Sequence, residues 1–194
     1  CSSDLIDKFV LDAVISKCFD RINHAALLQK LGYKGKVRQQ IKAWLKSGVI
    51  DQGVLTATSE GSPQGGNLSP LLANIALHGM ETRVKEYAAT WKGTKRDNIK
   101  SISLIRYADD FLILHKDHNV IATCKKIIEE WLNDIGLELN QEKTKISHTL
   151  QEFEGNKPGF DFLGFNIRQY PVGKYQSGKA TNGSTLGFKT LIKP

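Results

Sequence analysis

Residues 101–115 read SISLIRYADDFLILH, and they place two adjacent carboxylates, Asp109 and Asp110, in the middle of an apolar stretch. Short runs rich in Ile, Leu and Phe flank the acids, and this pattern predicts a tight β-hairpin with the acids at its turn. A carboxylate taken out of water is costly unless it is paired, hydrogen-bonded or bound to metal, and adjacent carboxylates repel each other. The stretch therefore indicates a cationic partner. A surface turn that is acidic by chance is the alternative interpretation.

The composition of the 194-residue chain favours a polyanionic partner. Lys and Arg number 27 against 20 Asp and Glu, so the net charge is +7 and the isoelectric point is near 9.3. This balance suits nucleic acid. An acidic membrane surface is the weaker alternative, because the sequence has no run of about 18 apolar residues and no basic amphipathic helix. Cys1, Cys18 and Cys124 lack metal-type spacing and are expected to be reduced thiols.

The order of the predicted elements gives the fold class. They are a strand at 8–15, helices at 24–31 and 37–48, an extended hairpin at 53–67, a helix that starts at Ser69 and runs to 91, a basic loop at 92–100, the acidic hairpin, a helix at 120–136, and strands at 137–148 and 159–170. Without the insertions this is a β-α-β-β-α-β pattern, so we expect an α+β fold of the ferredoxin-like type. In such a fold the first strand lies beside the acidic hairpin. Carboxylates on those strands would then bridge two metal ions about 3.5 to 4 Å apart, as in phosphoryl-transfer sites.

Five ordered blocks of sequence carry a resemblance to a known family. They are CFDRINHAALLQKLG at 18–32, GSPQGGNLSPLLANIALHGME at 61–81, YADD at 107–110, GLELNQEKTKI at 136–146 and FDFLGF at 160–165. Together they resemble the reverse transcriptase domain of group II intron-encoded maturases, over nearly the whole chain. The resemblance implies that 1–194 is a polymerase palm with part of the fingers inserted. It also implies a larger protein, in which a thumb or maturase domain begins near 188–194.

The resemblance assigns roles at the acidic hairpin. Asp109 and Asp110 would bind Mg²⁺, a hard cation that prefers carboxylate and phosphate oxygens, with Mn²⁺ as a substitute. Tyr107 would press on the primer terminus. Phe19 would be the steric gate that excludes a ribose 2′-OH and so favours dNTPs, whereas an ordinary core phenylalanine is the alternative.

The resemblance also assigns roles outside the hairpin. The nucleotide or template would be contacted by Gln64, Gly65 and Gly66, since the glycines permit close backbone approach. Lys143 would protonate the departing pyrophosphate, although surface lysines are common. The primer grip would consist of Phe162, Leu163 and Gly164. The alternative for residues 64–66 is a plain glycine turn, and the alternative for residues 162–164 is a plain core strand.

One position departs from the family pattern. The family has a third metal-binding aspartate five residues before the gate aromatic, and this chain has Val14 there. Asp12 is on the same strand face but lies about 6.6 Å back along the strand, so it cannot simply replace the missing ligand. A valine offers no oxygen, and we therefore expect impaired or abolished polymerisation. Two ions are expected only in a site with the aspartate restored.

The resemblance implies partners as well as a reaction. The expected function is RNA-directed DNA polymerisation with an RNA template, a DNA primer or target, and dNTPs, linked to splicing and retrohoming of an intron. The alternative is a maturase that binds group II intron RNA without polymerising; an unrelated phosphotransferase would need another acid near Asp109. The expected location is bacterial cytoplasm or an organellar compartment, with no membrane partner, and a homodimer is left open.

Overall fold

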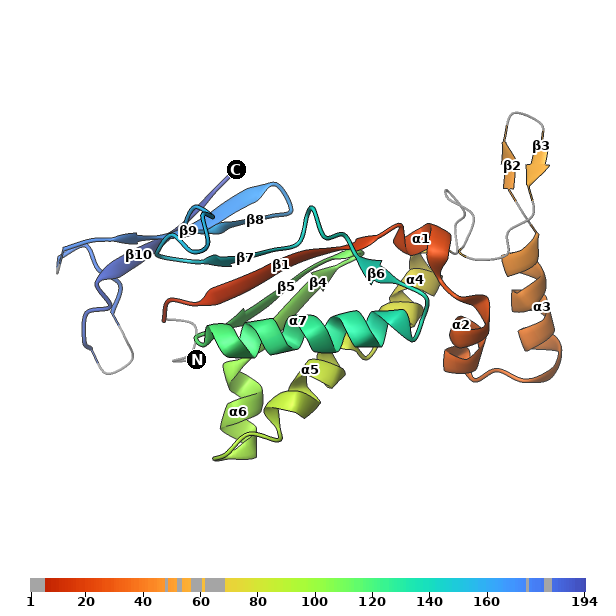
Figure 1. The fold of residues 1–194 in the computed structure, drawn as a ribbon, viewed down its shortest axis with the longest axis horizontal. Coiled ribbons are helices and arrows are strands. Elements are labelled where there is room, and N and C mark those ends of the chain that lie inside the picture. Colours follow the sequence, from red (N-terminus) through yellow and green to blue (C-terminus); the bar gives the residue numbers. More distant parts are fainter. Residues whose placement is uncertain are drawn as a thin grey trace.

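The computed structural model describes residues 6–47, 49–51, 54–56, 61, 69–173, 175–179 and 183–194. Figure 1 shows the order of the elements along the chain. The first half contains β1 (Phe9–Ser16), α1 (Cys18–Arg21), α2 (His24–Leu31), α3 (Gly35–Lys46), β2 (Val49–Asp51), β3 (Val54–Thr56), α4 (Ser69–Leu77) and α5 (Met80–Ala88). The second half contains α6 (Lys95–Ser101), β4 (Ser103–Tyr107), β5 (Asp110–His115), α7 (His118–Asn133), β6 (Glu138–Leu139), β7 (Lys145–His148), β8 (Phe160–Phe162), β9 (Phe165–Pro171) and β10 (Phe188–Lys193). Among the helices of these ranges, none combines the length and the apolar character that a bilayer span requires.

The central sheet is antiparallel, and β1 lies in its middle. Its strands run in the order β4, β5, β1, while β6 and β7 both pair with the other edge of β1. Helical segments separate β1 from β4, and α7 separates β5 from β6. A hairpin flanked by two crossovers in this way is the ferredoxin-like β-α-β-β-α-β unit. The structure therefore confirms the predicted α+β fold.

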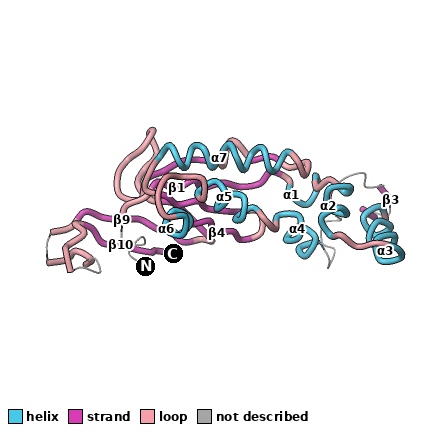
Figure 2. Tube along the Cα trace, turned by 90° about the horizontal axis from the view of Figure 1, so that it is seen from below, coloured by secondary structure: helices cyan, strands magenta, loops and turns pink. Residues whose placement is uncertain are grey.

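Side chains of β1 alternate between the two faces of the central sheet, as strand geometry requires. Leu11, Ala13 and Ile15 are buried in the main core, and Figures 1 and 2 show α7 lying along the sheet. The fully buried side chains of α7 are Ile121, Cys124, Ile128 and Leu132. Helical spacing predicts an inward face of Ile121, Cys124, Ile128, Trp131 and Ile135. The first three are confirmed, whereas Trp131 and Ile135 are only partly buried against the core and Ile135 lies beyond the end of the helix.

The opposite face of the central sheet is partly covered by a second sheet, whose strands run in the order β10, β9, β8. Val10 of β1 and Leu112 of β5 form a small core with Phe160 of β8. Val14 and Asp110, at the other end of the same strands, remain partly exposed. The second sheet therefore leaves one end of this face open.

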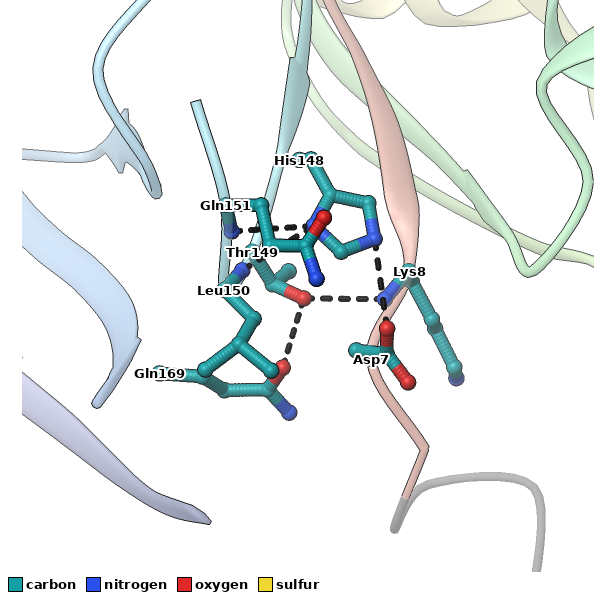
Figure 3. A network of polar contacts seen from close by, with 7 residues as sticks. All are labelled: Asp7, Lys8, His148, Thr149, Leu150, Gln151 and Gln169. Atoms are coloured by element: carbon teal, nitrogen blue, oxygen red, sulfur yellow. Dashed lines mark hydrogen bonds and ion pairs between the residues drawn. The ribbon is translucent and has the colours of Figure 1, made fainter. Parts of the chain in front are cut away.

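A polar network joins β1 to the strands that follow α7 (Figure 3). The Thr149 hydroxyl accepts from the Lys8 N–H at 2.9 Å and donates to Gln169 Oε1 at 2.6 Å. His148 Nε2 lies 3.4 Å from Asp7 Oδ2. Lys8, Thr149 and Gln169 are buried, so these bonds satisfy polar groups that water does not reach. The network holds the second sheet against the N-terminal end of β1.

Some helix boundaries agree with the sequence predictions, and one predicted helix is interrupted. Helix α2 is capped by Asn23, whose Oδ1 accepts from two backbone N–H groups, and it ends at Gly32 with φ 68°. The predicted helix from Ser69 to 91 instead divides at Gly79, which has φ 97°. Glycine adopts this left-handed conformation without a steric penalty, so it separates α4 from α5.

Two further predictions about helices were wrong. Residues 92–100 were expected to form a basic loop, yet Lys95 to Ser101 form α6, which has no buried residue. Such a helix lacks the apolar periodicity by which helices are found in sequence. On α3, helical spacing predicts one apolar face formed by Val37, Ile41, Trp44 and Leu45. Val37 and Trp44 are instead 52% and 48% exposed, Ile41 is partly buried, and Leu45 alone is fully buried.

The described cysteines agree with the expectation of reduced thiols. Cys18 and Cys124 are both free and buried. Burial raises the pKa of the Cys18 thiol to about 11, with Asp109 adding to the effect, and it raises the pKa of Cys124 to about 12. Both thiols are therefore protonated and unreactive at neutral pH.

Candidate active site

The acidic residues lie at the predicted hairpin turn. Tyr107 of β4 pairs with Asp110 of β5, so Ala108 and Asp109 form a two-residue loop. Ala108 has φ 53°, a left-handed conformation that costs a non-glycine residue roughly 1 to 2 kcal/mol. Arg106 Nη1 donates to Ala108 O at 2.8 Å and to Asn74 Oδ1 at 3.1 Å, and these bonds fasten the turn to α4. The prediction of the hairpin is confirmed.

Val14 lies directly opposite Asp110 on the neighbouring strand. The two residues are register partners in the antiparallel pair of β1 and β5. Directly opposed residues share a sheet face, and their Cα atoms are about 4.5 to 5.5 Å apart. The Ile15 N–H donates to Asp109 O at 3.0 Å, which holds the turn against β1. The expected closeness of Val14 to the carboxylates is confirmed.

The surroundings of Asp110 disfavour its negative charge. Partial burial raises the pKa of its carboxyl, the neighbouring Asp109 raises it further, and the positive charge of Lys143 opposes both effects. Like charges and desolvation act in the same direction on an acid. A cation bound between the two carboxylates would relieve both costs.

Asp12 is engaged elsewhere and does not complete the site. It is the register partner of Lys145 on β7, and Lys145 Nζ lies 3.4 Å from Asp12 Oδ2. Burial raises the pKa of the Asp12 carboxyl, whereas Lys145 lowers it and the charges of Asp161 and Asp110 raise it. The ion pair compensates a carboxylate whose side chain is only 16% exposed. The conclusion that Asp12 cannot replace a ligand at position 14 agrees with this pairing.

Lys143 is held near the site by Asn140, a residue that the sequence interpretation did not single out. The Asn140 N–H donates to Val14 O at 2.8 Å, and Asn140 Oδ1 accepts from the N–H groups of Glu142 and Lys143 at 3.1 Å each. An asparagine that bonds the backbone two residues on is typical of a tight turn. The stretch NQEK contained this signal, but the contact with β1 depends on the tertiary structure.

The predicted primer grip forms the turn between β8 and β9. Phe162 pairs with Phe165, and the turn residues Leu163 and Gly164 have φ 52° and 81°. Phe162 is half-buried against the small core of Val10, while Leu163 is 50% exposed. An exposed leucine in a left-handed conformation is unusual, and such strain is common at functional sites. A role in gripping a primer remains a prediction.

The other predicted residues are placed as follows. Tyr107 is 63% exposed beside the two aspartates. Phe19 belongs to α1, but its side chain lies outside the described part of the structure. Residues 64–66, which include Gln64, Gly65 and Gly66, also lie outside the described residues.

The donor atoms fit one magnesium ion better than two. Asp109 and Asp110 offer carboxylate oxygens, and Mg²⁺ is commonly held by one or two carboxylates together with water and substrate phosphates. Within the described residues, no group of three or more His, Cys, Asp or Glu side chains could hold a metal ion. A bridged pair of ions needs a further carboxylate, and the nearest strand position carries Val14. Among the described residues, Asp109 and Asp110 are therefore the two carboxylates that could hold a cation at this turn.

The fold and the paired acids at its hairpin are typical of a polymerase palm, and comparison with known proteins agrees. The family model described as "Reverse transcriptase (RNA-dependent DNA polymerase)" matches residues 6–167. The chain belongs to the reverse transcriptase family.

Among curated relatives, Protein YkfC of Escherichia coli K12 is 29% identical over 82% of this chain and 47% of its own length. Group II intron-encoded protein LtrA of Lactococcus lactis is 26% identical over 96% of this chain and 39% of its own length. The putative COX1/OXI3 intron 1 protein of Saccharomyces cerevisiae is also 26% identical, over 95% and 27% of the two chains. The resemblance to intron-encoded proteins is thus confirmed. The chain spans less than half the length of these relatives.

Solved structures of telomerase share the fold. The telomerase of Candida albicans, in complex with a fragment of telomeric RNA, matches 92% of this chain and 31% of its own with a TM-score of 0.64 and 19% identity. Apo telomerase of Candida tropicalis matches 83% of this chain and 31% of its own with a TM-score of 0.62. At this identity the likeness concerns the fold alone.

Proposed function

We propose that the chain is the palm, with part of the fingers, of a group II intron-encoded RNA-directed DNA polymerase. The observation that carries this proposal is the pairing of β1 with the hairpin of β4 and β5, which gathers Asp109, Asp110 and position 14 at one end of an open sheet face. The intron-encoded relatives support the lineage. The reaction would join a primer 3′-OH to a dNTP and release pyrophosphate.

The residues of the chain would divide this work among them. Asp109 and Asp110 would hold Mg²⁺ or Mn²⁺, which supplies positive charge to the reacting phosphate. Lys143, kept near Asp110 by Asn140, would give a proton to the departing pyrophosphate. Tyr107 would pack against the primer terminus, with 162–164 as the primer grip. Phe19 and residues 64–66 would contact the incoming nucleotide, on the resemblance alone.

Val14 weakens polymerisation in this assignment. With a methyl group where a carboxylate oxygen would be needed, position 14 would supply no ligand to a second ion, and the reacting groups would be less well oriented. We expect a loss of several kcal/mol of transition-state stabilisation, by analogy with the removal of other preorganised electrostatic contacts. A second candidate function is therefore RNA binding in intron splicing without polymerisation, which Val14 and the +7 charge both favour.

The test restores the missing carboxylate. Val14→Asp in the full-length protein is expected to raise dNTP incorporation at least a hundredfold in primer extension with RNA template, DNA primer and Mg²⁺, because the loss corresponds to roughly 3 kcal/mol or more. RNA occupancy must be matched between the two forms. Mg²⁺ should also raise the melting temperature of Val14→Asp more than that of the parent chain, because a third carboxylate strengthens binding to the folded state.

Two controls decide between the interpretations. Val14→Asn has nearly the shape of the aspartate variant without its charge and should be no more active than the parent. Asp109→Ala in the Val14→Asp chain should abolish the gain. Equal activity of the parent and Val14→Asp proteins would show that a third carboxylate is not needed. RNA binding with no extension by either form would favour the splicing function.

The partners and surroundings of the proposed polymerase follow from its resemblance to intron-encoded proteins. The template would be RNA, the primer or target DNA, and the bound intron a group II intron RNA, with retrohoming as the biological outcome. A thumb or maturase domain would begin near 188–194. The protein would work in bacterial cytoplasm or an organellar matrix, and a homodimer is an open option that gel filtration of the full-length protein would test.

A further inference from the structure

The positive charge of the chain is concentrated in its last part. Of the net +7, residues 155–194 carry +5, since they hold six Lys and Arg residues and a single acid, Asp161. This segment contains the second sheet, β8 to β10. Figures 1 and 2 show β9 and β10 projecting past the end of the central sheet. Charge on this sheet is therefore displaced from the carboxylate site.

The register of β9 and β10 sorts their side chains onto two faces. Ile167 and Gln169 face the central sheet, because Ile167 packs on the Val10 core and Gln169 bonds Thr149. Their neighbours along the strand must face outward. The outward set consists of Asn166, Arg168 and Tyr170 on β9 with their partners Lys193, Leu191 and Lys189 on β10.

This outward face carries what we call the basic strip, namely Arg168, Lys189, Lys193 and Tyr170. Arg168 Cζ lies 4.7 Å and Lys193 Nζ 5.9 Å from the centre of the Tyr170 ring. Both lysines are exposed, and the ion pairs found among the described residues involve neither of them. The acid on this face, Asp161, accepts from Asn166 Nδ2 at 2.8 Å at one end of the strip.

A fully exposed aromatic ring lies just beyond the strip. Tyr175, in the connection between β9 and β10, is 99% exposed. The rows of the strip run from Asn166 and Lys193 to Tyr170 and Lys189, a length of about 13 Å at 3.3 Å per residue. The connection that contains Tyr175 follows β9 at the end of the strip where Tyr170 pairs with Lys189. The whole Tyr175 ring is therefore open to solvent in this connection.

We propose that the basic strip and Tyr175 bind a single-stranded nucleic acid segment, away from the carboxylate site. The cations would contact successive phosphates, and Tyr175 would stack on a base, the combination by which single strands are held without sequence preference. The contact with the Tyr170 ring restricts the Arg168 guanidinium, so this group would be positioned in advance to bind a phosphate. The inference rests on the proposed function, since a protein that copies or binds RNA must hold an unpaired strand.

The test measures binding of fluorescent oligo(U) RNA and oligo(dT) DNA by anisotropy at several salt concentrations. Lys189→Gln with Lys193→Gln should make the log–log salt slope shallower by about 1.4, the share of two phosphate contacts on a single strand. The matched control is Lys92→Gln with Lys95→Gln, two exposed lysines near α6, which should leave the slope unchanged. Melting curves verify that all variants fold.

Tyr175 gives an independent arm. Tyr175→Ala should weaken binding of the single strands about 5- to 150-fold, while Tyr175→Phe, which keeps the stacking ring, should bind like the parent. Three results would overturn the assignment of the strip. They are an equal change of salt slope from both lysine pairs, no effect of Tyr175→Ala on affinity, and tighter binding of duplex than of single strands. If the parent binds RNA and the variants bind equally well, the strip is rejected but the proposed function is not. If the parent binds no RNA, the proposed function is rejected. The RNA and DNA arms show which strand the strip takes.

Discussion

Val14 is an apolar residue in a part of the sheet that is otherwise lined by charged side chains. Asp109 and Asp110 are crowded at one turn, Lys143 is held nearby, and the position opposite Asp110 is occupied by a side chain that can neither bind a cation nor accept a hydrogen bond. A valine there removes like-charge repulsion, because a third carboxylate would raise the cost of the pair. The apo fold therefore gains stability from the residue that weakens the proposed reaction.

The pair of Asp12 and Lys145 gives a prediction at the residue scale. Lys145→Met should lower the free energy of unfolding by about 1 to 3 kcal/mol at pH 7, the usual worth of a hydrogen-bonded contact to a charged group. Folding raises the Asp12 pKa above 3.8, so ionisation of this carboxyl costs stability progressively as the pH rises from 3.8 to the folded pKa, and the full cost is present above the folded pKa. Losing Lys145 raises that pKa further. The deficit should therefore shrink when the pH falls from 7 to about 4, because the carboxyl then becomes protonated in the folded parent and in the folded variant, and Lys145 no longer has a charge to neutralise.

Urea unfolding of the parent and variant across this pH range measures the effect. The double variant Asp12→Asn with Lys145→Met removes the buried charge together with its partner and should recover most of the stability at pH 7. A deficit that is the same at both pH values would mean that Lys145 acts through its methylene packing instead of its charge.

At the scale of elements, the turns of this protein carry its unusual backbone conformations. The hairpin of β4 and β5 turns at Ala108, and that of β8 and β9 turns at Leu163, and both residues have positive φ. Such residues cost free energy that the surrounding strands must supply. The two strained turns belong to the two hairpins that the family resemblance singles out.

Gly159 gives a prediction at this scale. It precedes β8 with φ 96°, and an added Cβ would lie 2.7 Å from Ile167 O and 2.8 Å from Arg168 Cβ. Gly159→Ala should therefore lower the free energy of unfolding by about 2 to 4 kcal/mol, from left-handed strain plus overpacking. Gly155 has φ 78° and open space around it, so Gly155→Ala should cost only about 1 kcal/mol. Equal losses in thermal or urea unfolding would show that packing against β9 is looser than the structure indicates.

At the scale of the whole molecule, the carboxylate pair and most of the net positive charge belong to different parts of the chain. The carboxylates lie at the open end of the central sheet, while most of the net positive charge belongs to 155–194. Sequence-independent attraction to a polyanion depends on the summed positive charge and not on the metal ligands. RNA binding and polymerisation should thus be separable by mutation.

The salt dependence of RNA binding tests this separation. Affinity for structured RNA should fall with salt with a log–log slope steeper than about −2, the value for three phosphate contacts on a single strand. Asp109→Ala should leave both slope and affinity within about twofold of the parent, since it removes no cation. Filter binding between low and moderate salt measures both quantities. A flat dependence would contradict a phosphate-dominated interface.

The sequence by itself determined the β-α-β-β-α-β order of the core elements, the bounds of α2, the acidic turn and the positive charge, because these follow from local chemistry and periodicity along the chain. Only the tertiary structure decided that Lys145 neutralises Asp12 and that Asn140 fastens the Lys143 turn to Val14 O, because strand register joins residues more than a hundred positions apart. It also decided that α6 is helical and that α3 leaves Trp44 half-exposed, since burial depends on what the rest of the chain places against each face.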